Sequence, residues 1–163
     1  MAEPIQIRHL RAVKSRLSAI SVANGYLTNA GENIYFGPRV HSKSNCPVIN
    51  VVGGADEPQK AASGGSRSME LRQVIYVDGF VEEFDDSEES GLAGEEIKAD
   101  IKQAVLDYNA QALTDATDDD NLGSLEYAGA VPIEKADNSD VEGIRVTFYV
   151  INKEGFGNPY ATR

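Results

Sequence analysis

The chain has 163 residues, of which 41% are hydrophobic, and a formal net charge of −11. That length suits one folded domain and is short for two, and the hydrophobic content is typical of a globular rather than a disordered chain. No stretch approaches the roughly 18 apolar residues of a membrane span, and the single cysteine excludes an intrachain disulfide framework. We therefore expect a soluble protein without a signal peptide, made in the cytoplasm.

Charge is distributed unevenly along the chain. Residues 1–45 carry six Lys or Arg and two acids, whereas residues 78–142 carry twenty acids and three lysines. The acidic balance argues against nucleic-acid binding, which needs clustered Lys and Arg to neutralise phosphates. Two interpretations remain open. One is a self-repelling soluble surface. The other is a basic end that faces the acidic end of a neighbouring subunit, with surplus acid lining a channel through which DNA slides.

Residues 8–20 predict an amphipathic helix. Four apolar residues recur at spacings of three, four and three and so share one helical face: Leu10, Val13, Leu17 and Ile20. A turn with several glycines follows, and glycine tolerates the positive φ of a chain reversal. Residues 34–37 then predict a short aromatic strand.

This opening carries a resemblance to a known family. The helix and the stretch LSAISVANGYLTNAGENIYFGPR that ends at Arg39 resemble the start of the tail terminator (minor tail) proteins of long-tailed bacteriophages. The match is densest over residues 10–39 and rests beyond them on element order and length. It implies a small α/β domain that closes into a six-membered ring, caps the growing tail tube and presents a surface to head-completion proteins. It also implies functional residues that are interfacial rather than catalytic.

The next segments predict a strand and a loop. The apolar run at residues 47–52 is bounded by Pro and Gly-Gly and predicts a buried strand. Residues 53–68 are rich in Gly, Ser, Ala and Pro and predict a mobile loop that becomes ordered on docking. The G-x-x-x-x-G-K-[ST] spacing of a phosphate-binding loop is absent. We expect this loop and the C-terminal tail to contact the tail tube or the head connector through Gly53, Gly54, Gly64, Gly65, Phe156 and Tyr160.

Along residues 69–77, mostly apolar residues recur at every second position, and this period of two predicts a central strand. Residues 82–94 then form an acidic connector. A catalytic carboxylate pair or a hard-cation site is one interpretation of its charge, but a run of like charges beside Gly and Ser is more typical of a solvated loop. Glu95 and Glu96 fall in the first turn of the next predicted helix, where the helix dipole favours negative charge.

Residues 94–114 predict a helix with two apolar stripes. The main stripe contains Ile97, Ile101 and Val105. Leu106 and Leu113 lie nearly opposite, seven residues apart. Either the helix is sandwiched between the sheet and the first helix, or these two leucines meet a neighbouring subunit, because an exposed apolar stripe is a liability unless it is an interface.

The remaining chain predicts a hairpin and a tail. Residues 115–123 lack the D-x-[DN]-x-[DN]-G frame of a calcium loop and predict a solvated turn. In residues 125–133 and 144–151, the side-chain character alternates from one position to the next, which predicts two antiparallel strands. Pro132 should lie at a sheet edge or bulge, because it has no N–H to donate. Residues 153–163 predict a flexible tail.

The whole pattern predicts an α+β protein: a mixed, mostly antiparallel sheet with two helices packed on one face. Residues 1–152 would form the single domain and 153–163 the tail. With two histidines and one cysteine, the usual zinc and nucleophile constellations are absent, so we expect neither an enzyme nor a cofactor.

The function that we expect is that of a tail terminator, a virion protein at the head-proximal end of the tail that assembles in the host cytoplasm. Its partners would be copies of itself in a ring of six, the tail tube protein and a head-completion protein, with DNA passing through and no membrane contact. Head-to-tail contacts form rings when the rotation closes, and opposite charges favour such pairing. Reversing Arg8 and Arg11 to Glu should then weaken the ring. The residues expected at the subunit interface are Arg8, Arg11, Asp85, Asp86, Leu106 and Leu113, and those expected to line the DNA channel are Glu88, Glu89, Asp118, Asp119 and Asp120.

The alternatives are a neck or head-completion protein of the same virion, the tube protein itself, and a small cytoplasmic enzyme or ligand-binding domain. Binding to the tail tube rather than to the portal assembly would separate a terminator from a neck protein. Open-ended tubes would identify a tube protein. A closed pocket with convergent polar groups would indicate an enzyme or ligand-binding domain.

Overall fold

The computed structural model describes residues 3–60, 68–83, 89, 91–106, 112–114, 121–134, 140–155 and 158–162. Two helices, α1 (Ile5–Leu17) and α2 (Leu92–Val105), accompany seven strands. The strands are β1 (Ile34–Phe36), β2 (Val48–Lys60), β3 (Ser68–Glu82), β4 (Ala112–Thr114), β5 (Asn121–Ile133), β6 (Val141–Gly155) and β7 (Asn158–Thr162). Three short 3₁₀ turns interrupt the connections: η1 (Val22–Asn24), η2 (Ala30–Glu32) and η3 (Lys43–Asn45).

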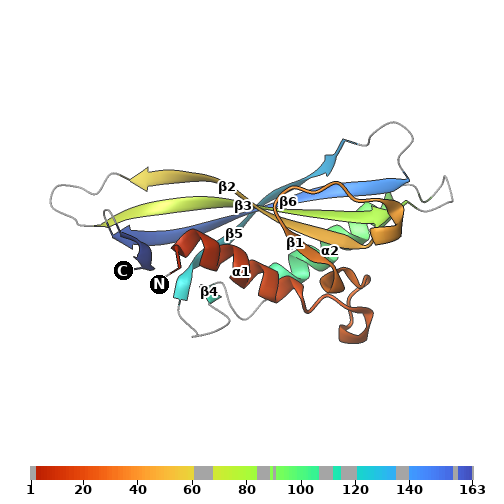
Figure 1. Ribbon diagram of the computed structural model, residues 1–163, viewed down its shortest axis with the longest axis horizontal. Helices are drawn as coiled ribbons and strands as arrows, with labels where there is room; N and C mark the ends of the chain where they lie inside the picture. The colour runs from red at the N-terminus through yellow and green to blue at the C-terminus, as the bar shows by residue number, and fades with distance from the viewer. Residues whose placement is uncertain are drawn as a thin grey trace.

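All seven strands form one twisted sheet (Figure 1). Its order is β1-β2-β3-β6-β5-β4, and β7 pairs with β6 outside this path. β1 runs parallel to β2, and every other pairing is antiparallel. The α+β class and the mixed, mostly antiparallel sheet are therefore confirmed, as is the hairpin of β5 and β6.

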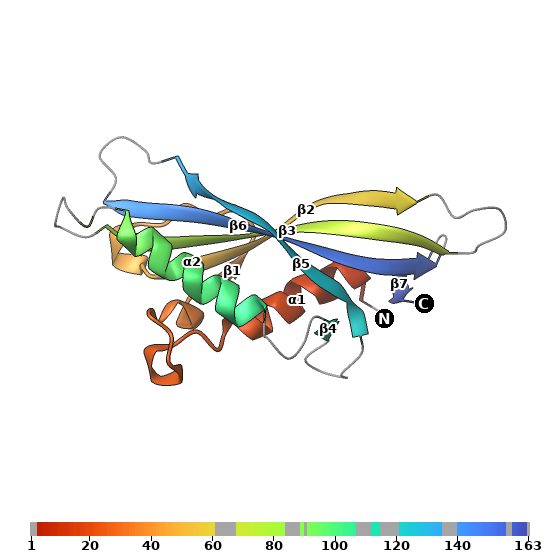
Figure 2. The same cartoon turned by 180° about the vertical axis from the view of Figure 1, so that it is seen from behind.

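Both helices lie on the same face of the sheet, as Figures 1 and 2 show from opposite sides. The alternation in the long strands explains this arrangement, because a period of two directs every second side chain toward the helices. Ile75 and Val77 of β3 are buried in one cluster with Val146 and Phe148 of β6. The helices contribute their apolar stripes to the same cluster: Ile5, Val13, Leu17, Ile97 and Ile101.

β5 is an edge strand over most of its length in the described part of the chain. β4 pairs only with the first residues of β5, up to Ser124. Among the described residues, no strand therefore pairs with the outer side of β5 at Pro132. The position predicted for this proline, at a sheet edge, is confirmed. Among the described residues no helix is long and apolar enough to cross a membrane.

The predicted helix over residues 94–114 is too long, because α2 ends at Val105. Arg16 of α1 donates hydrogen bonds to the backbone oxygens of Val105, at 2.6 Å, and of Ala112, at 2.7 Å. The guanidinium satisfies a carbonyl that the end of a helix leaves without an internal partner, and it ties α2 to β4. Leu113 lies in β4 and is wholly buried. Its prediction as a subunit contact is wrong, since its own chain already covers it.

Two segments predicted to be flexible are strands instead. β2 continues through Gly53 and Gly54 to Lys60 against β3, and β7 pairs with β6 within the predicted tail. Glycine-rich composition weakens a strand, but pairing with a long neighbouring strand overrides such local preference. Gly54 also has a packing role, because a Cβ there would lie 2.9 Å from the Tyr76 ring. Gly64 and Gly65 of the predicted loop lie outside the described residues.

Candidate interaction surface

The segment between α1 and β1 is a rigid platform held by a buried carboxylate. Asp100 of α2 is 1% exposed. Its Oδ1 accepts a hydrogen bond from the backbone N–H of Leu27 at 2.9 Å, and its Oδ2 accepts two from Thr28, from the N–H and the hydroxyl, each at 2.8 Å. These charge-assisted bonds compensate for the cost of burying the carboxylate. They fix residues 21–29, which we call the platform, against α2.

The platform holds two large apolar side chains in solvent. Val22 is 57% exposed and Leu27 is 59% exposed. Beside them lies a cavity of about 300 Å³, which we call the acidic pocket. Its wall is apolar where Pro47, Val81 and Ala93 line it, and Glu82 and Glu96 also line it. An ordered loop that keeps apolar side chains at the mouth of a cavity is typical of a protein-interaction site.

The acidic pocket belongs to a strongly negative end of the molecule. The ends of β3, β5 and β6 and the start of α2 meet there, since Glu82 pairs with Val141, Ile133 with Gly143, and Glu142 accepts hydrogen bonds from Gly91 and Gly94. The described residues of this end carry eight acids and two lysines: Glu82, Glu83, Glu89, Glu95, Glu96, Glu134, Asp140 and Glu142, with Lys43 and Lys98. Both lysines already pair with acids there.

The outer side of α1 carries the opposite charge. Ile7, Arg11 and Lys14 follow one another at spacings of four and three and so form one stripe, which we call the basic stripe. Ile7 is 42% exposed, and the Arg11 side chain is 66% exposed while pairing with Glu3 at 3.0 Å. The Lys14 ammonium lies 4.9 Å from the centre of the Phe36 ring, a cation–π contact. The stripe thus combines an exposed aliphatic side chain with two cations.

The sheet face opposite the helices has a different chemistry. Arg145 donates two hydrogen bonds to Asp78, at 2.7 and 2.8 Å, and lies over the ring of Tyr76. Arg72 pairs with Glu57 and lies over the Tyr149 ring in the same way. Each guanidinium is thus paired with a carboxylate and stacked on an aromatic ring, so these two arginines add no net positive charge to this face.

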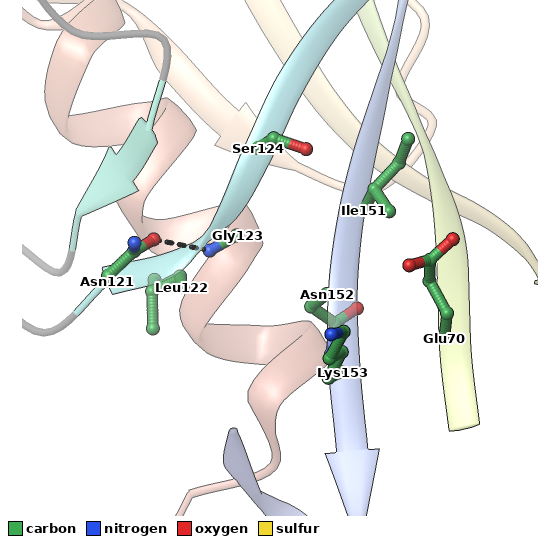
Figure 3. Close-up of a pocket in the computed structure, with 8 residues that line it drawn as sticks. All are labelled: Glu70, Asn121, Leu122, Gly123, Ser124, Ile151, Asn152 and Lys153. Atoms are coloured by element: carbon green, nitrogen blue, oxygen red, sulfur yellow. Dashed lines mark hydrogen bonds between the residues drawn. The ribbon is translucent and has the colours of Figure 1, made fainter. Parts of the chain in front are cut away.

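A second cavity, of about 440 Å³, opens where β5 separates from β6 (Figure 3). The pairing of these strands begins at Ser124 and Ile151. Gly123, with a φ of +138°, lies so close to the Ile151 oxygen that a Cβ would come within 2.5 Å of it. Asn152 lines this cavity and is buried, and its Nδ2 has no hydrogen-bond partner among the described groups. The other polar side chains that line it are Glu70, Asn121, Ser124 and Lys153.

Two buried titratable groups lie beneath α1. The His9 nitrogens are 2.6 Å from the side-chain oxygen of Gln73 and 2.8 Å from the Leu122 oxygen, and burial lowers the pKa of this imidazole despite these contacts. Glu154 accepts a hydrogen bond from Gln6 at 3.1 Å, and burial raises the pKa of this carboxyl group. Both groups connect α1 to the sheet. The described residues contain no cluster of three His, Cys, Asp or Glu that could hold a metal ion.

The structure places the predicted site residues in different environments. Arg11 is exposed as expected, whereas Arg8 and Leu106 are half-buried, and Leu106 packs against the core. Glu89 is exposed at the acidic end. Gly53 and Gly54 lie in β2, and Tyr160 lies in β7. The remaining predicted positions fall outside the described residues: Gly64, Gly65, Asp85, Asp86, Glu88, Asp118, Asp119, Asp120 and Phe156.

Sequence reasoning missed the platform. Val22 and Leu27 follow no helical or strand period, so nothing in the pattern distinguishes them from core residues. The one available signal was Asp100, an acid on the apolar side of α2 between Ile97 and Ile101. An acid in such a position needs hydrogen-bond donors from elsewhere in the chain, and the platform supplies them.

No protein-family model and no curated protein sequence matches the chain. Among solved structures, a chain described as "Virion of native gene transfer agent (GTA) particle" is similar, with a TM-score of 0.57 and 14% sequence identity. The match covers 89% of this chain and 94% of that one. At this level of identity the likeness establishes that the two chains share a fold.

Proposed function

We propose that this protein is a structural component of a phage-like virion, and more specifically a tail terminator. The observation that carries the proposal is the fold shared, over nearly the whole of both chains, with a chain of the gene transfer agent virion. The resemblance of residues 10–39 to tail terminators supports the finer assignment. In this role the protein acts by assembly and catalyses no reaction.

The charge distribution supports ring formation by head-to-tail contacts. The acidic end and the basic stripe lie on different parts of the molecule, so a copy can present one to each of its two neighbours. Such a heterologous contact produces a closed ring when its rotation closes, and six copies is the number that the resemblance implies. Like-on-like contacts would instead bring two strongly negative ends together.

The sheet edges argue against assembly by strand addition. Pro58 of β2 and Pro132 of β5 offer no N–H to a further strand, and both strands contain register shifts where they pair with their neighbours. Prolines and bulges are features that protect exposed edges from pairing. We therefore expect subunits to meet through side chains rather than by extension of the sheet.

Within the virion, the ring would cap the tail tube and stop its polymerisation. It would also present its other face to the head-completion protein. DNA would pass through the central opening, where surplus acidic side chains would repel its phosphates and prevent binding. The protein would therefore lie at the head-proximal end of the tail and assemble in the host cytoplasm.

Native mass spectrometry of the purified protein, alone and with its tail tube protein, tests this function. A discrete hexamer, alone or on the tube tips, is the expected result. A chain that stays monomeric and ignores the tube under all conditions would contradict the proposal. Binding to the portal assembly instead of the tube would indicate a neck protein, and open-ended tubes would indicate a tube protein.

A charge reversal tests the pairing separately. Arg11→Glu should weaken the ring, because the exposed guanidinium then becomes a carboxylate facing an acidic neighbour. Lys153→Glu is the matched control, since Lys153 is also an exposed base but lies on β6 outside the basic stripe. A ring of unchanged stability in Arg11→Glu would remove charge pairing from the proposal.

A further inference from the structure

We propose that the acidic pocket of one copy receives the basic stripe of the next copy, with the Ile7 side chain in the cavity. This inference rests on the proposed function, because it assigns the contact that would hold the ring together. The occupant of the pocket is thus a second copy of this chain.

The pocket is organised to receive an aliphatic side chain. Its volume of about 300 Å³ exceeds that of one such group, and Val22, Leu27 and Val81 provide apolar contacts. The platform that presents Val22 and Leu27 is held by three hydrogen bonds to Asp100, so little order has to be gained on docking. Pre-ordering of this kind lowers the entropic cost of association.

The basic stripe has the complementary form. Ile7 is the aliphatic side chain that α1 exposes most, and Arg11 and Lys14 follow it at the next turns of the same face. When Ile7 enters the cavity, the two cations approach the rim at which Glu82 and Glu96 lie. An apolar centre with a charged rim is the usual anatomy of a specific protein interface.

The two surfaces cannot meet within one copy. α1 begins toward the left of the view in Figure 1, whereas the acidic end lies at the right, and both surfaces are on the helical side of the sheet. The contact therefore joins two copies, and it is heterologous, as a ring requires, when each copy gives its stripe to one neighbour and its pocket to the other. A symmetric contact of two stripes or two pockets would place like charges together.

The single cysteine of the chain makes a direct test available, because Cys46 lines the pocket. In the Ile7→Cys variant, a short bismaleimide applied to the assembled ring should join the introduced thiol of one copy to Cys46 of the next. Each chain would then be linked on both sides, so denaturing gels should show a ladder up to the full ring. Val131→Cys is the matched control, since Val131 is also an exposed aliphatic residue but lies on β5, outside the basic stripe of α1, and it should give no ladder.

The outcomes separate this inference from the proposed function. A ring seen by native mass spectrometry that gives no ladder, or gives the same ladder with Val131→Cys, would overturn the inference and leave the ring in place. Cross-linked dimers that persist when Cys46→Ser is added to Ile7→Cys would show a symmetric contact and also overturn it. Absence of any ring, with or without tube protein, would count against the proposed function itself.

A charge exchange gives a second readout. Arg11→Glu and Glu96→Lys should each raise the protein concentration needed for half-maximal assembly about tenfold, and the double variant should recover most of that loss. Leu27→Ser should weaken assembly similarly, whereas Val40→Ser, which alters a fully exposed apolar residue elsewhere, should not. Additive losses in the double charge variant would contradict direct pairing of these residues.

Discussion

Asp100 and Thr28 are 72 residues apart in sequence, yet one carboxylate oxygen of Asp100 accepts hydrogen bonds from both the backbone N–H and the hydroxyl of Thr28, each at 2.8 Å. This contact joins α2 to the platform. Asp100 also accepts a hydrogen bond from the backbone N–H of Leu27, so the carboxylate holds this side of the platform at the acidic pocket.

Replacing this carboxylate should loosen the platform. Asp100→Asn places an amide NH₂ against N–H groups of the platform, so at least one buried donor loses its acceptor. We expect the free energy of unfolding to fall by about 1–3 kcal/mol in urea titrations. Amide hydrogen exchange at Leu27 and Thr28 should also accelerate. Asp140→Asn, at an exposed acid, should change neither quantity, and slow exchange that persists in Asp100→Asn would contradict the role of the carboxylate.

Gly31 should tolerate no larger residue. A Cβ there would lie 2.5 Å from the Ile20 oxygen and 2.8 Å from the Leu17 oxygen, and backbone atoms at the end of α1 cannot move aside easily. Gly31→Ala should lower the free energy of unfolding by about 1–3 kcal/mol. Gly53→Ala is the control, because the nearest atom to its Cβ is a Leu10 side-chain carbon at 3.5 Å. Equal stability of the two variants would be inconsistent with the structure.

His9 should make stability depend on pH. Burial lowers its pKa from the ordinary value of 6.5, so the unfolded chain takes up a proton at a higher pH than the folded one. This contribution to stability is fully present above about pH 6.5 and is lost as the pH falls from there through the lowered pKa. Urea midpoints measured from pH 8 to pH 5 should fall in the wild type and fall less steeply in His9→Gln. An identical slope in both proteins would assign the dependence to other groups.

Glu154 should make stability depend on pH in the opposite direction. Burial raises its pKa from the ordinary value of 4.5, so the folded chain holds this proton more tightly, and stability is lost as the pH rises through the raised pKa. Glu154→Gln removes the buried charge and keeps an oxygen for Gln6. The variant should therefore have a higher Tm than the wild type at pH 7 to 8, with the difference shrinking toward pH 4. A variant less stable than the wild type at pH 8 would show that the ionised carboxylate is favourable there.

Much of the fold was predictable because it depends on local periodicity. The alternation around Ile75 and Val77 predicted the central strand, and the spacing of Val13 and Leu17 predicted the face of α1 that is buried. The acidic charge over the second half of the chain likewise anticipated the acidic end. Predictions failed where a distant partner decides the local structure, as at Gly53 and Gly54 in β2, and at Leu113, which the seven-residue spacing from Leu106 wrongly placed in a helix.

The amino-acid sequence by itself determined the α+β class, the buried faces of the two helices, the strands of the central hairpin and the uneven charge. These features follow from the spacing of apolar and charged residues, which local backbone geometry converts directly into faces. Only the tertiary structure decided which surfaces are available for interaction. The exposure of Val22, Leu27 and Ile7, and the burial of Leu113, depend on contacts between residues tens of positions apart, such as Asp100 with Thr28 and Arg16 with Val105. Such contacts leave no periodic signal in the chain, because each is one pair of groups brought together by the packing of whole elements.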